Sequence, residues 1–180
     1  NKIYSKSEYM TALINSFAEF SKLNHPDFKL KLKEENLCEI VRNYLADTYN
    51  YIIDQGIEPI FDIPDEVYTV ETDQLHFERS IANIISNFVK YNKKGTKMHV
   101  SIYRSQSDVV LVMENDGVPI EKGIVDNIFA PLVTGDASRS SESTGLGLAS
   151  AKRVVELHGG QIRYTRTEKY ANSFMITLPS

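Results

Sequence analysis

The sequence predicts an α+β domain, a two-layer α/β sandwich in which one mixed sheet carries its helices on one face. Two observations lead to this class. Segments with the two-residue period of strands and segments with the helical period follow one another without a regular strand–helix–strand alternation. The chain has 180 residues, 42% of them hydrophobic, which suits one domain with a short appendage.

Composition excludes several classes of function. A net charge of −4 argues against a nucleic-acid partner, because such proteins usually carry a basic stripe. A single cysteine, Cys38, rules out an internal disulfide, and we expect a reducing, cytoplasmic setting. No apolar run approaches the roughly eighteen residues of a membrane span. Any membrane anchor is therefore expected in segments outside this chain.

The N-terminal stretch predicts a helix over residues 8–24. Its apolar residues follow 3-4-3 spacing over about two heptads, as in a coiled-coil seam: Met10, Leu13, Phe17 and Phe20. This face could pack on a partner helix or dock on its own domain. His25-Pro26 ends the helix, because proline does not continue one. We therefore divide the chain into residues 1–25 and 26–180.

The remaining elements follow in order. The patterns predict a strand at 28–32, a helix at 34–55 ended by Gly56, and strands at 58–63 and 67–70. Thr72 or Asp73 can cap the next helix, which runs through residues 77–91. A hairpin over 97–115 follows, its second strand the more central, with His99 exposed. A short helix near 125–129, a mobile loop to 143, a helix at 146–157 and strands at 161–167 and 173–178 complete the chain.

Residues 77–91 carry a second, polar row opposite their apolar face. Asn83, Asn87 and Lys90 stand at i, i+4 and i+7, on one face of a helix, with Tyr91 beside them. A carboxamide oxygen can ligate Mg²⁺, its NH₂ can donate to a phosphate oxygen, and a lysine suits polyphosphate. The alternative is a surface helix that merely carries two asparagines.

Two glycine-containing motifs add to this row. Glu114-Asn115-Asp116-Gly117-Val118-Pro119-Ile120 ends a buried strand, where Asn115 can bond to the edge of a heterocycle; the alternative is a plain turn. Ser143-Thr144-Gly145-Leu146-Gly147-Leu148 opens a helix, where free N–H groups suit a di- or triphosphate. It is not a P-loop, because no Gly-Lys-Ser/Thr follows.

Together these motifs resemble the catalytic, ATP-binding domain of sensor histidine kinases, in the superfamily that includes DNA gyrase, Hsp90 and MutL. The segment NIISNFVKY resembles the N box, ENDGVPI and STGLGL the two glycine boxes, IFAPL the F box, and HGGQIRY…SFMITLP the closing strands. The resemblance covers about residues 28–180 and implies the Bergerat ATP-binding fold. It also implies that residues 1–25 are the end of a dimerisation helix.

The resemblance assigns catalytic roles to the row on the central helix. Asn87 matches the residue that binds Mg²⁺ between the phosphates, Asn83 the asparagine near the γ-phosphate, and Lys90 a residue that reaches the phosphates. ATP-hydrolysing members of the superfamily carry a glutamate at the position of Asn83, so this site favours phosphoryl transfer to an imidazole over hydrolysis. The implied nucleotide contacts are Asn83, Asn87, Lys90, Tyr91, Asn115, Gly117, Thr144, Gly145, Leu146, Gly147 and Leu148.

The chain departs from the family pattern at four positions. Asn115 stands where the family usually has the adenine-binding aspartate, Pro119 replaces a glycine, and Ser143 replaces a glycine at the start of the lid. Phe88 stands where a small residue is common, so we expect it to crowd the pocket. Asn115 can still accept a bond from the adenine amine. A neutral bond is worth roughly 0.5–1.5 kcal/mol against about 1.5–3 for a charged one. We therefore expect ATP binding to be several-fold weaker than with aspartate.

The phosphate-accepting histidine is expected elsewhere. None of His25, His76, His99 and His158 lies in a helical motif of the accepting type. The resemblance therefore implies a histidine on dimerisation helices outside this chain, a homodimer, and relay to the receiver domain of a response regulator. A nucleotide-binding scaffold without transfer and an anti-sigma-type serine kinase remain as alternatives.

Overall fold

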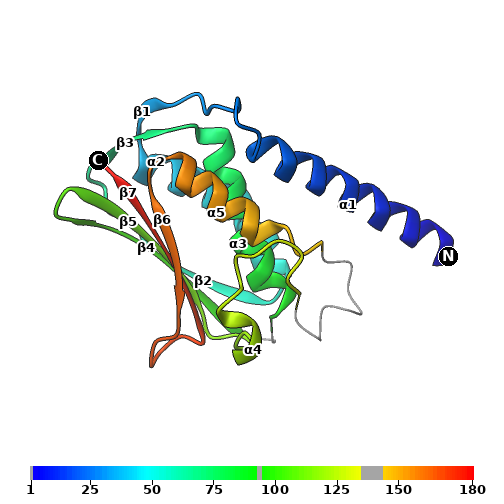
Figure 1. Cartoon of the computed structure of the whole chain (residues 1–180). Helices are drawn as coiled ribbons and strands as arrows, with labels where there is room; N and C mark the ends of the chain where they lie inside the picture. Colours follow the sequence, from blue (N-terminus) through cyan, green and yellow to red (C-terminus); the bar gives the residue numbers. More distant parts are fainter. Residues whose placement is uncertain (1, 93–94, 135–143) are drawn as a thin grey trace.

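The structure is a computed structural model that describes residues 2–92, 95–134 and 144–180. Its helices and strands are labelled in Figure 1. The helices are α1 (Lys2–Leu23), α2 (Leu37–Asp54), α3 (Gln74–Lys90), α4 (Lys122–Val125) and α5 (Gly147–Leu157). The strands are β1 (Lys33–Asn36), β2 (Ile57–Asp62), β3 (Thr69–Thr72), β4 (Thr96–Ser105), β5 (Asp108–Asn115), β6 (Gln161–Thr165) and β7 (Asn172–Pro179).

Five of the strands form one mixed sheet in the order β2-β4-β5-β7-β6. β2 runs parallel to β4, and the other neighbours are antiparallel. The predicted hairpin is confirmed as β4–β5, closed by a two-residue turn in which Gln106 has a φ of 55°. β5 is the central strand, as its wholly apolar run predicted, because it is covered on both edges.

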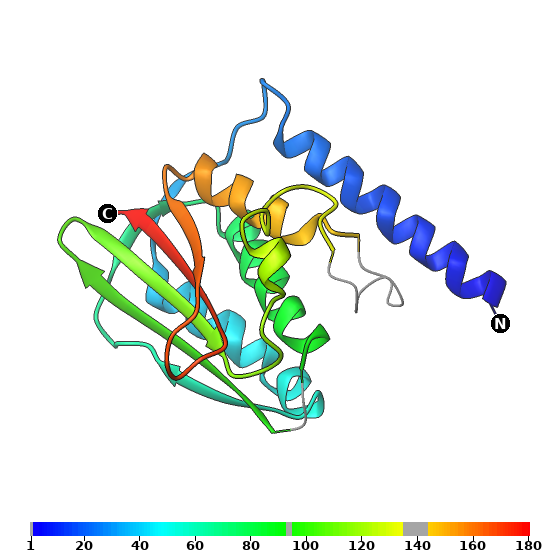
Figure 2. The same cartoon turned by 60° about the horizontal axis from the view of Figure 1, so that its bottom comes forward.

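Helices α2, α3 and α5 lie together on one face of this sheet, as Figures 1 and 2 show. The side chains of Val109, Leu111 and Met113 on β5 are buried in the same core as those of the helices. The core residues of α3 are Phe77, Ile81, Ile84, Ile85 and Phe88. The predicted two-layer sandwich is therefore confirmed.

Several predicted elements differ from the structure: α1 begins at Lys2 rather than at residue 8, and β3 spans Thr69–Thr72 rather than 67–70. Residues 28–32 form no strand; the strand is β1, which pairs with β3 in a separate two-stranded sheet. The predicted helix 34–55 begins at Leu37, because the Asn36 side chain accepts a bond from the Cys38 N–H and fixes the helix start there. The short helix α4 lies at Lys122–Val125, ahead of the predicted 125–129.

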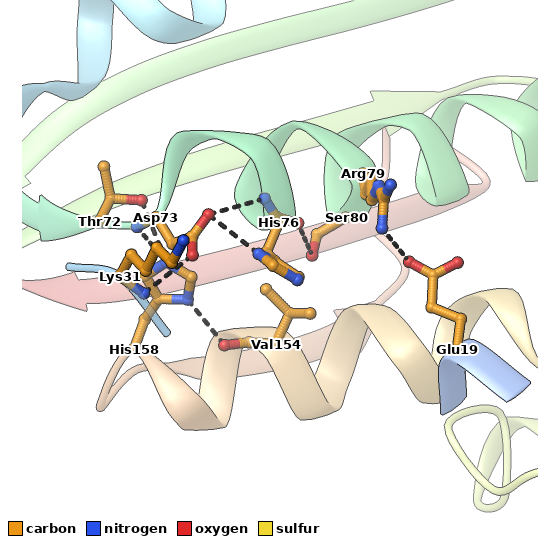
Figure 3. Close-up of polar contacts among 9 residues, drawn as sticks. All are labelled: Glu19, Lys31, Thr72, Asp73, His76, Arg79, Ser80, Val154 and His158. Carbon is orange, nitrogen blue, oxygen red and sulfur yellow. Dashed lines mark hydrogen bonds and ion pairs between the residues drawn. The ribbon is translucent and has the colours of Figure 1, made fainter. Parts of the chain in front are cut away.

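A polar cluster fixes the start of α3 (Figure 3). Asp73 is the N-cap: its carboxylate accepts bonds from the backbone N–H of His76 at 3.3 Å and of Lys31 at 2.9 Å. The buried His158 ring donates from Nδ1 to the Val154 carbonyl at 2.8 Å. Its Nε2 therefore carries no proton and accepts a bond from the Asp73 N–H at 3.0 Å. The end of α5 and the start of α3 are thus joined through a neutral imidazole.

Helix α1 extends away from the sheet and its helices, and its last turns contact them (Figures 1 and 2). Leu23 is buried, and its carbonyl accepts a bond from Arg153 on α5. Glu19 pairs with Arg79 of α3 at 2.6 Å (Figure 3). Within the part of the chain that the structure describes, no helix is both long and apolar enough to cross a membrane.

The expectation that His99 is exposed is wrong. Its side chain is only 16% exposed and lies between Asp62, at 2.6 Å from Nε2, and Glu114, at 3.5 Å from Nδ1. The Tyr170 ring from the β6–β7 connection stacks on it with 5.7 Å between centroids. A connection distant in sequence thus covers a position that strand alternation alone assigns to solvent.

The buried His158 predicts a pH dependence of folding. Burial lowers its pKa below the ordinary value near 6.5, and this outweighs the Val154 hydrogen bond and the Asp73 carboxylate, which raise it. Its neutral form is therefore preferred in the folded state, so its contribution is complete above about pH 6.5 and is lost as the pH falls toward the folded pKa.

The free energy of unfolding should accordingly decrease below about pH 6.5, and His158→Gln should remove part of that decrease. Urea unfolding across this range measures it. His25→Gln is the matched control, because His25 lies exposed in a turn. Equal pH slopes in the two variants would contradict the assignment.

Candidate functional site

A cavity of about 290 Å³ lies between α3, the segment that follows β5, and the start of α5. The residues that line it come from four separate parts of the chain: Asn83, Ser86, Asn87, Lys90, Tyr91; Val118, Pro119, Ile120, Glu121, Ile124, Ile128; Val133, Thr134; and Thr144, Gly145, Gly147, Leu148. Eight of the eleven predicted contacts are thus brought together on one cavity.

The polar row on α3 faces this cavity because the opposite face of the helix is buried. Ile81, Ile84 and Phe88 are in the core, which sets the rotation of the helix. Phe88 therefore does not crowd the pocket, contrary to the expectation. Asn83 lies beside the start of α5: a Cβ added to Gly147 would lie 3.4 Å from its Oδ1. The two predicted motifs therefore meet at one end of the cavity.

Asn87 lines the cavity with its carboxamide held at the nitrogen end. Its Nδ2 donates to the backbone carbonyl of Asn83, one turn earlier, at 2.8 Å. The amide is thereby oriented, and its Oδ1 has no hydrogen-bond partner among the described residues. An oxygen held in this way is a hard ligand of the kind Mg²⁺ prefers, so the position fits a metal carried by phosphates.

Lys90 brings an unpaired charge. Its Nζ is buried and has no hydrogen-bond partner among the described residues. The ammonium lies 5.1 Å from the centroid of the Tyr91 ring, a cation–π distance. A buried cation without a hydrogen-bond partner among the described residues suits an anionic ligand.

The start of α5 adds backbone donors to the same end. The helix has no side-chain cap; Leu146, at the cap position, is buried. Gly145 has a φ of +67°, and an added Cβ would come within 2.8 Å of the Leu132 backbone. Free N–H groups and the positive end of the helix dipole suit phosphate oxygens. The predicted loop continues into residues 135–143, which lie outside the described residues.

The other end of the cavity is apolar. Tyr91, Val118, Ile120, Ile124 and Ile128 line it. Asn83 and Tyr91 are separated by a little over two turns of α3, roughly 12 Å. The end near Asn83 thus offers carboxamides and backbone donors, and the end near Tyr91 offers the Lys90 ammonium beside apolar walls suited to a planar ring.

Three predicted contacts do not line the cavity. Leu146 and Gly117 are buried behind it, and Asn115 is 1% exposed at the end of β5. The Asn115 Oδ1 accepts a bond from the Nδ2 of Asn172 at 2.8 Å, whereas its own Nδ2 is buried without a partner. A Cβ on Gly117 would lie 2.9 Å from that Nδ2 and 3.3 Å from the Tyr91 carbonyl. Asn115 therefore lies directly behind the apolar end.

The sequence reasoning missed several lining residues. The sequence could have predicted Ser86 as a lining residue, because it stands three residues after Asn83 and one turn before Lys90, on the same helix face. It could not have predicted the apolar residues after Gly117, because the turn that carries them is held by Asn172, more than fifty residues later.

Comparison with known proteins now decides the family. Residues 72–180 match the family described as "Histidine kinase-, DNA gyrase B-, and HSP90-like ATPase". The chain belongs to this family. The predicted resemblance to the ATP-binding domain of sensor histidine kinases is thereby confirmed, and membership of an ATPase family implies ATP binding.

Curated relatives of this ATPase-family chain are sensor kinases. The chain is 29% identical to the sensor protein KdpD of Clostridium acetobutylicum, over 99% of this chain and 20% of that protein. It is 30% identical to the sensor histidine kinase WalK of Bacillus subtilis, over 97% of this chain and 29% of that protein. The chain thus spans less than a third of the length of either relative.

Solved structures show the same fold. The catalytic domain of histidine kinase ThkA is 24% identical, with a TM-score of 0.73, over 83% of this chain and 96% of that one. A structure of ThkA in complex with the response regulator protein TrrA gives a TM-score of 0.78 at 21% identity, over 99% of this chain and 49% of that one. The second comparison includes the region of α1.

Replacing Lys90 should lower the affinity for nucleotide without lowering the stability of the fold. Lys90→Met removes a buried, unpaired ammonium, so we expect the free energy of unfolding to stay within about 1 kcal/mol of wild type or to rise. Affinity for a nucleoside triphosphate should fall about tenfold or more, because a charged contact is lost. Lys97→Met, on the exposed part of β4, should change neither the stability nor the affinity.

Denaturant unfolding measures the stability, and calorimetry measures the affinity. A loss of stability with unchanged affinity in Lys90→Met would contradict the role of Lys90 in binding phosphate.

Proposed function

We propose that this chain is the ATP-binding kinase domain of a two-component sensor histidine kinase. It binds Mg·ATP and transfers the γ-phosphoryl group to a histidine on dimerisation helices outside this chain, for relay to a response regulator. The observation that carries the proposal is the convergence on one cavity of a free carboxamide oxygen, an unpaired ammonium and an uncapped helix start.

Each of these groups has a defined part in phosphoryl transfer, which depends on positioning and charge neutralisation. Asn87 would hold Mg²⁺, which when bound neutralises charge on the phosphates. Lys90 binds the phosphates as a point charge, and the N–H groups at the start of α5 orient them. Asn83 stands near the terminal phosphate and cannot accept a proton at neutral pH, so the site is poorly built to activate water. Transfer to an imidazole is thereby favoured over hydrolysis.

Helix α1 supports the proposed dimer. Met10, Ile14 and Phe17 are exposed at i, i+4 and i+7, one face of the helix, while the end of the helix contacts the domain through Leu23. A face of this kind is buried when helices pair. We therefore propose that residues 1–25 are the end of the dimerisation helix of a homodimer and that residues 26–180 are the catalytic domain.

The histidines of this chain have other positions. His76 and His158 belong to the cluster at the start of α3, His99 lies between two carboxylates, and His25 lies in a turn. None lies within the cavity lining. The proposal therefore places the accepting histidine, the response regulator contact and any membrane anchor in other segments or partners, with this domain in the cytoplasm.

Removing the proposed metal ligand should abolish the metal dependence of nucleotide binding. Asn87→Ala leaves no oxygen at this position, so Mg·ATP affinity should fall at least about tenfold, while the weak binding measured with a chelator should not change. Asn50→Ala, on the exposed face of α2, is the control and should behave as wild type. Calorimetry with and without Mg²⁺ measures the difference. An unchanged Mg·ATP affinity would refute the role of Asn87.

A phosphoryl-transfer assay distinguishes a histidine kinase from a serine kinase and from a nucleotide-binding scaffold. The chain is mixed with a separate dimerisation domain that bears the accepting histidine and with γ-labelled ATP. We expect an acid-labile label on that domain. An acid-stable label would favour an anti-sigma-type serine kinase instead. Nucleotide binding without any label would favour a scaffold, the alternative that the departures at Asn115 and Pro119 support.

A further inference from the structure

The apolar end of the cavity has a wall that forms no helix or strand. Val118, Pro119 and Ile120 line the cavity from the segment that joins β5 to α4. Because this segment has no hydrogen-bond pattern of its own, its position depends on the bonds that its backbone makes with other segments. The Val118 N–H donates to the Tyr91 carbonyl at 3.2 Å, and Pro119 has no N–H to donate.

Asn172, the first residue of β7, holds this wall on both sides of Pro119. Its Nδ2 donates to the Val118 carbonyl at 3.0 Å. Its Oδ1 accepts a bond from the Ile120 N–H at 3.1 Å. One side chain thus bonds to two backbone groups of the wall, one before the proline and one after it.

The Asn172 amide is itself fixed in place. The residue is 3% exposed, its second N–H donates to the Asn115 Oδ1 at 2.8 Å, and its Oδ1 also accepts from the Tyr164 hydroxyl at 3.0 Å. A carboxamide has two N–H donors and an oxygen with two lone pairs, so all of its hydrogen-bonding capacity is used. A flipped amide would lose both bonds to the wall, because a backbone N–H only donates and a carbonyl only accepts.

Arg166, in the β6–β7 connection, adds a third bond to the wall. It donates from Nη2 to the Ile120 carbonyl, and its own side chain is exposed. Neither Asn172 nor Arg166 is among the described residues that line the cavity. Any effect that these two residues have on a ligand must therefore pass through the wall.

Resting on the proposed function, we propose that Asn172 is a positioning residue for the nucleoside part of ATP, because it holds the wall from Val118 to Ile120 in place. A pre-formed apolar wall binds a planar ring without first having to be ordered, whereas a wall that is not held must be ordered on binding, which lowers affinity. Asn83, Asn87 and the start of α5 belong to other elements, so their contacts with the phosphates do not depend on these bonds.

Tripolyphosphate is the matched probe, because it carries three linked phosphates, as ATP does, and no nucleoside. Calorimetry on the whole chain measures the affinities for Mg·ATP and for Mg·tripolyphosphate. Asn172→Ala removes both bonds to the wall, so the affinity for ATP should fall about tenfold. The affinity for tripolyphosphate should not change.

A variant of the same strand separates positioning from a general loss of stability. Ile176 is buried in the core on β7, and Ile176→Val removes a methyl group there without touching the wall. It should lower the thermal stability, because a core side chain is shortened, and leave both affinities at their wild-type values. Thermal unfolding of each variant is measured beside the calorimetry.

Arg166→Ala tests the wall by a second route that does not depend on a buried side chain. It removes the bond to the Ile120 carbonyl, so the ratio of ATP affinity to tripolyphosphate affinity should fall about threefold. Arg163→Ala is the matched control, because Arg163 is exposed on β6 and bonds to Gln161. It removes the same charge and should leave the ratio at its wild-type value.

The outcomes separate this inference from the function on which it rests. A wild-type ratio in Asn172→Ala, or in Arg166→Ala where Asn172→Ala does not fold, would overturn the inference. An equal loss of both affinities in Asn172→Ala would overturn it too, because it would show a general effect on the fold. In these cases the wild-type chain still binds ATP and the proposed function stands. A wild-type chain that does not bind ATP would overturn the proposed function, and the inference with it.

Discussion

The burial of one face of α3 is the constraint on which the site depends. Phe77, Ile81 and Ile84 are fully buried against the sheet, and Asp73 fixes where the helix starts. A change of register by one residue rotates the helix by about 100° and would place polar side chains in the core, Glu78 in one direction and Asn83 and Asn87 in the other. The rotation and height of α3 are therefore set by apolar packing, and the polar row of Asn83, Asn87 and Lys90 is carried to the cavity as a consequence.

Two polar groups at or beside the cavity are left unpaired in the described part of the chain. Within the described residues, the Lys90 Nζ and the Asn115 Nδ2 are buried without hydrogen-bond partners. Each such group disfavours folding by about 1–3 kcal/mol, against a typical total stability of roughly 5–15 kcal/mol. The packing of the helices on the sheet offsets this unfavourable free energy. A ligand that pairs the Lys90 ammonium recovers its share of this free energy on binding, which prepares the site for an anionic ligand such as a polyphosphate.

Local patterns predicted the elements whose structure is decided locally. The 3.6-residue period of α3, the alternation of β4 and the apolar run of β5 each indicate which face is buried, and the structure agrees. The failures occur where a distant segment decides. The helix propensity of Glu34 and Glu35 favoured a helix, but pairing with β3 holds them in β1. His99 alternates toward solvent, and Tyr170 from the β6–β7 connection covers it.

Asn87 and Asn115 show the same contrast between a side chain held by a local contact and one held by a distant segment. Asn87 is oriented by a carbonyl one turn earlier on its own helix, so the contact that holds its amide lies within reach of local sequence reasoning. Asn115 is oriented by Asn172 on another strand, so nothing local shows which end of its amide is free. A carboxamide is a donor or an acceptor according to the group that holds its other end. The chemistry of the phosphate end can therefore be read from one helix, whereas the chemistry of the base end requires the pairing of β5 with β7.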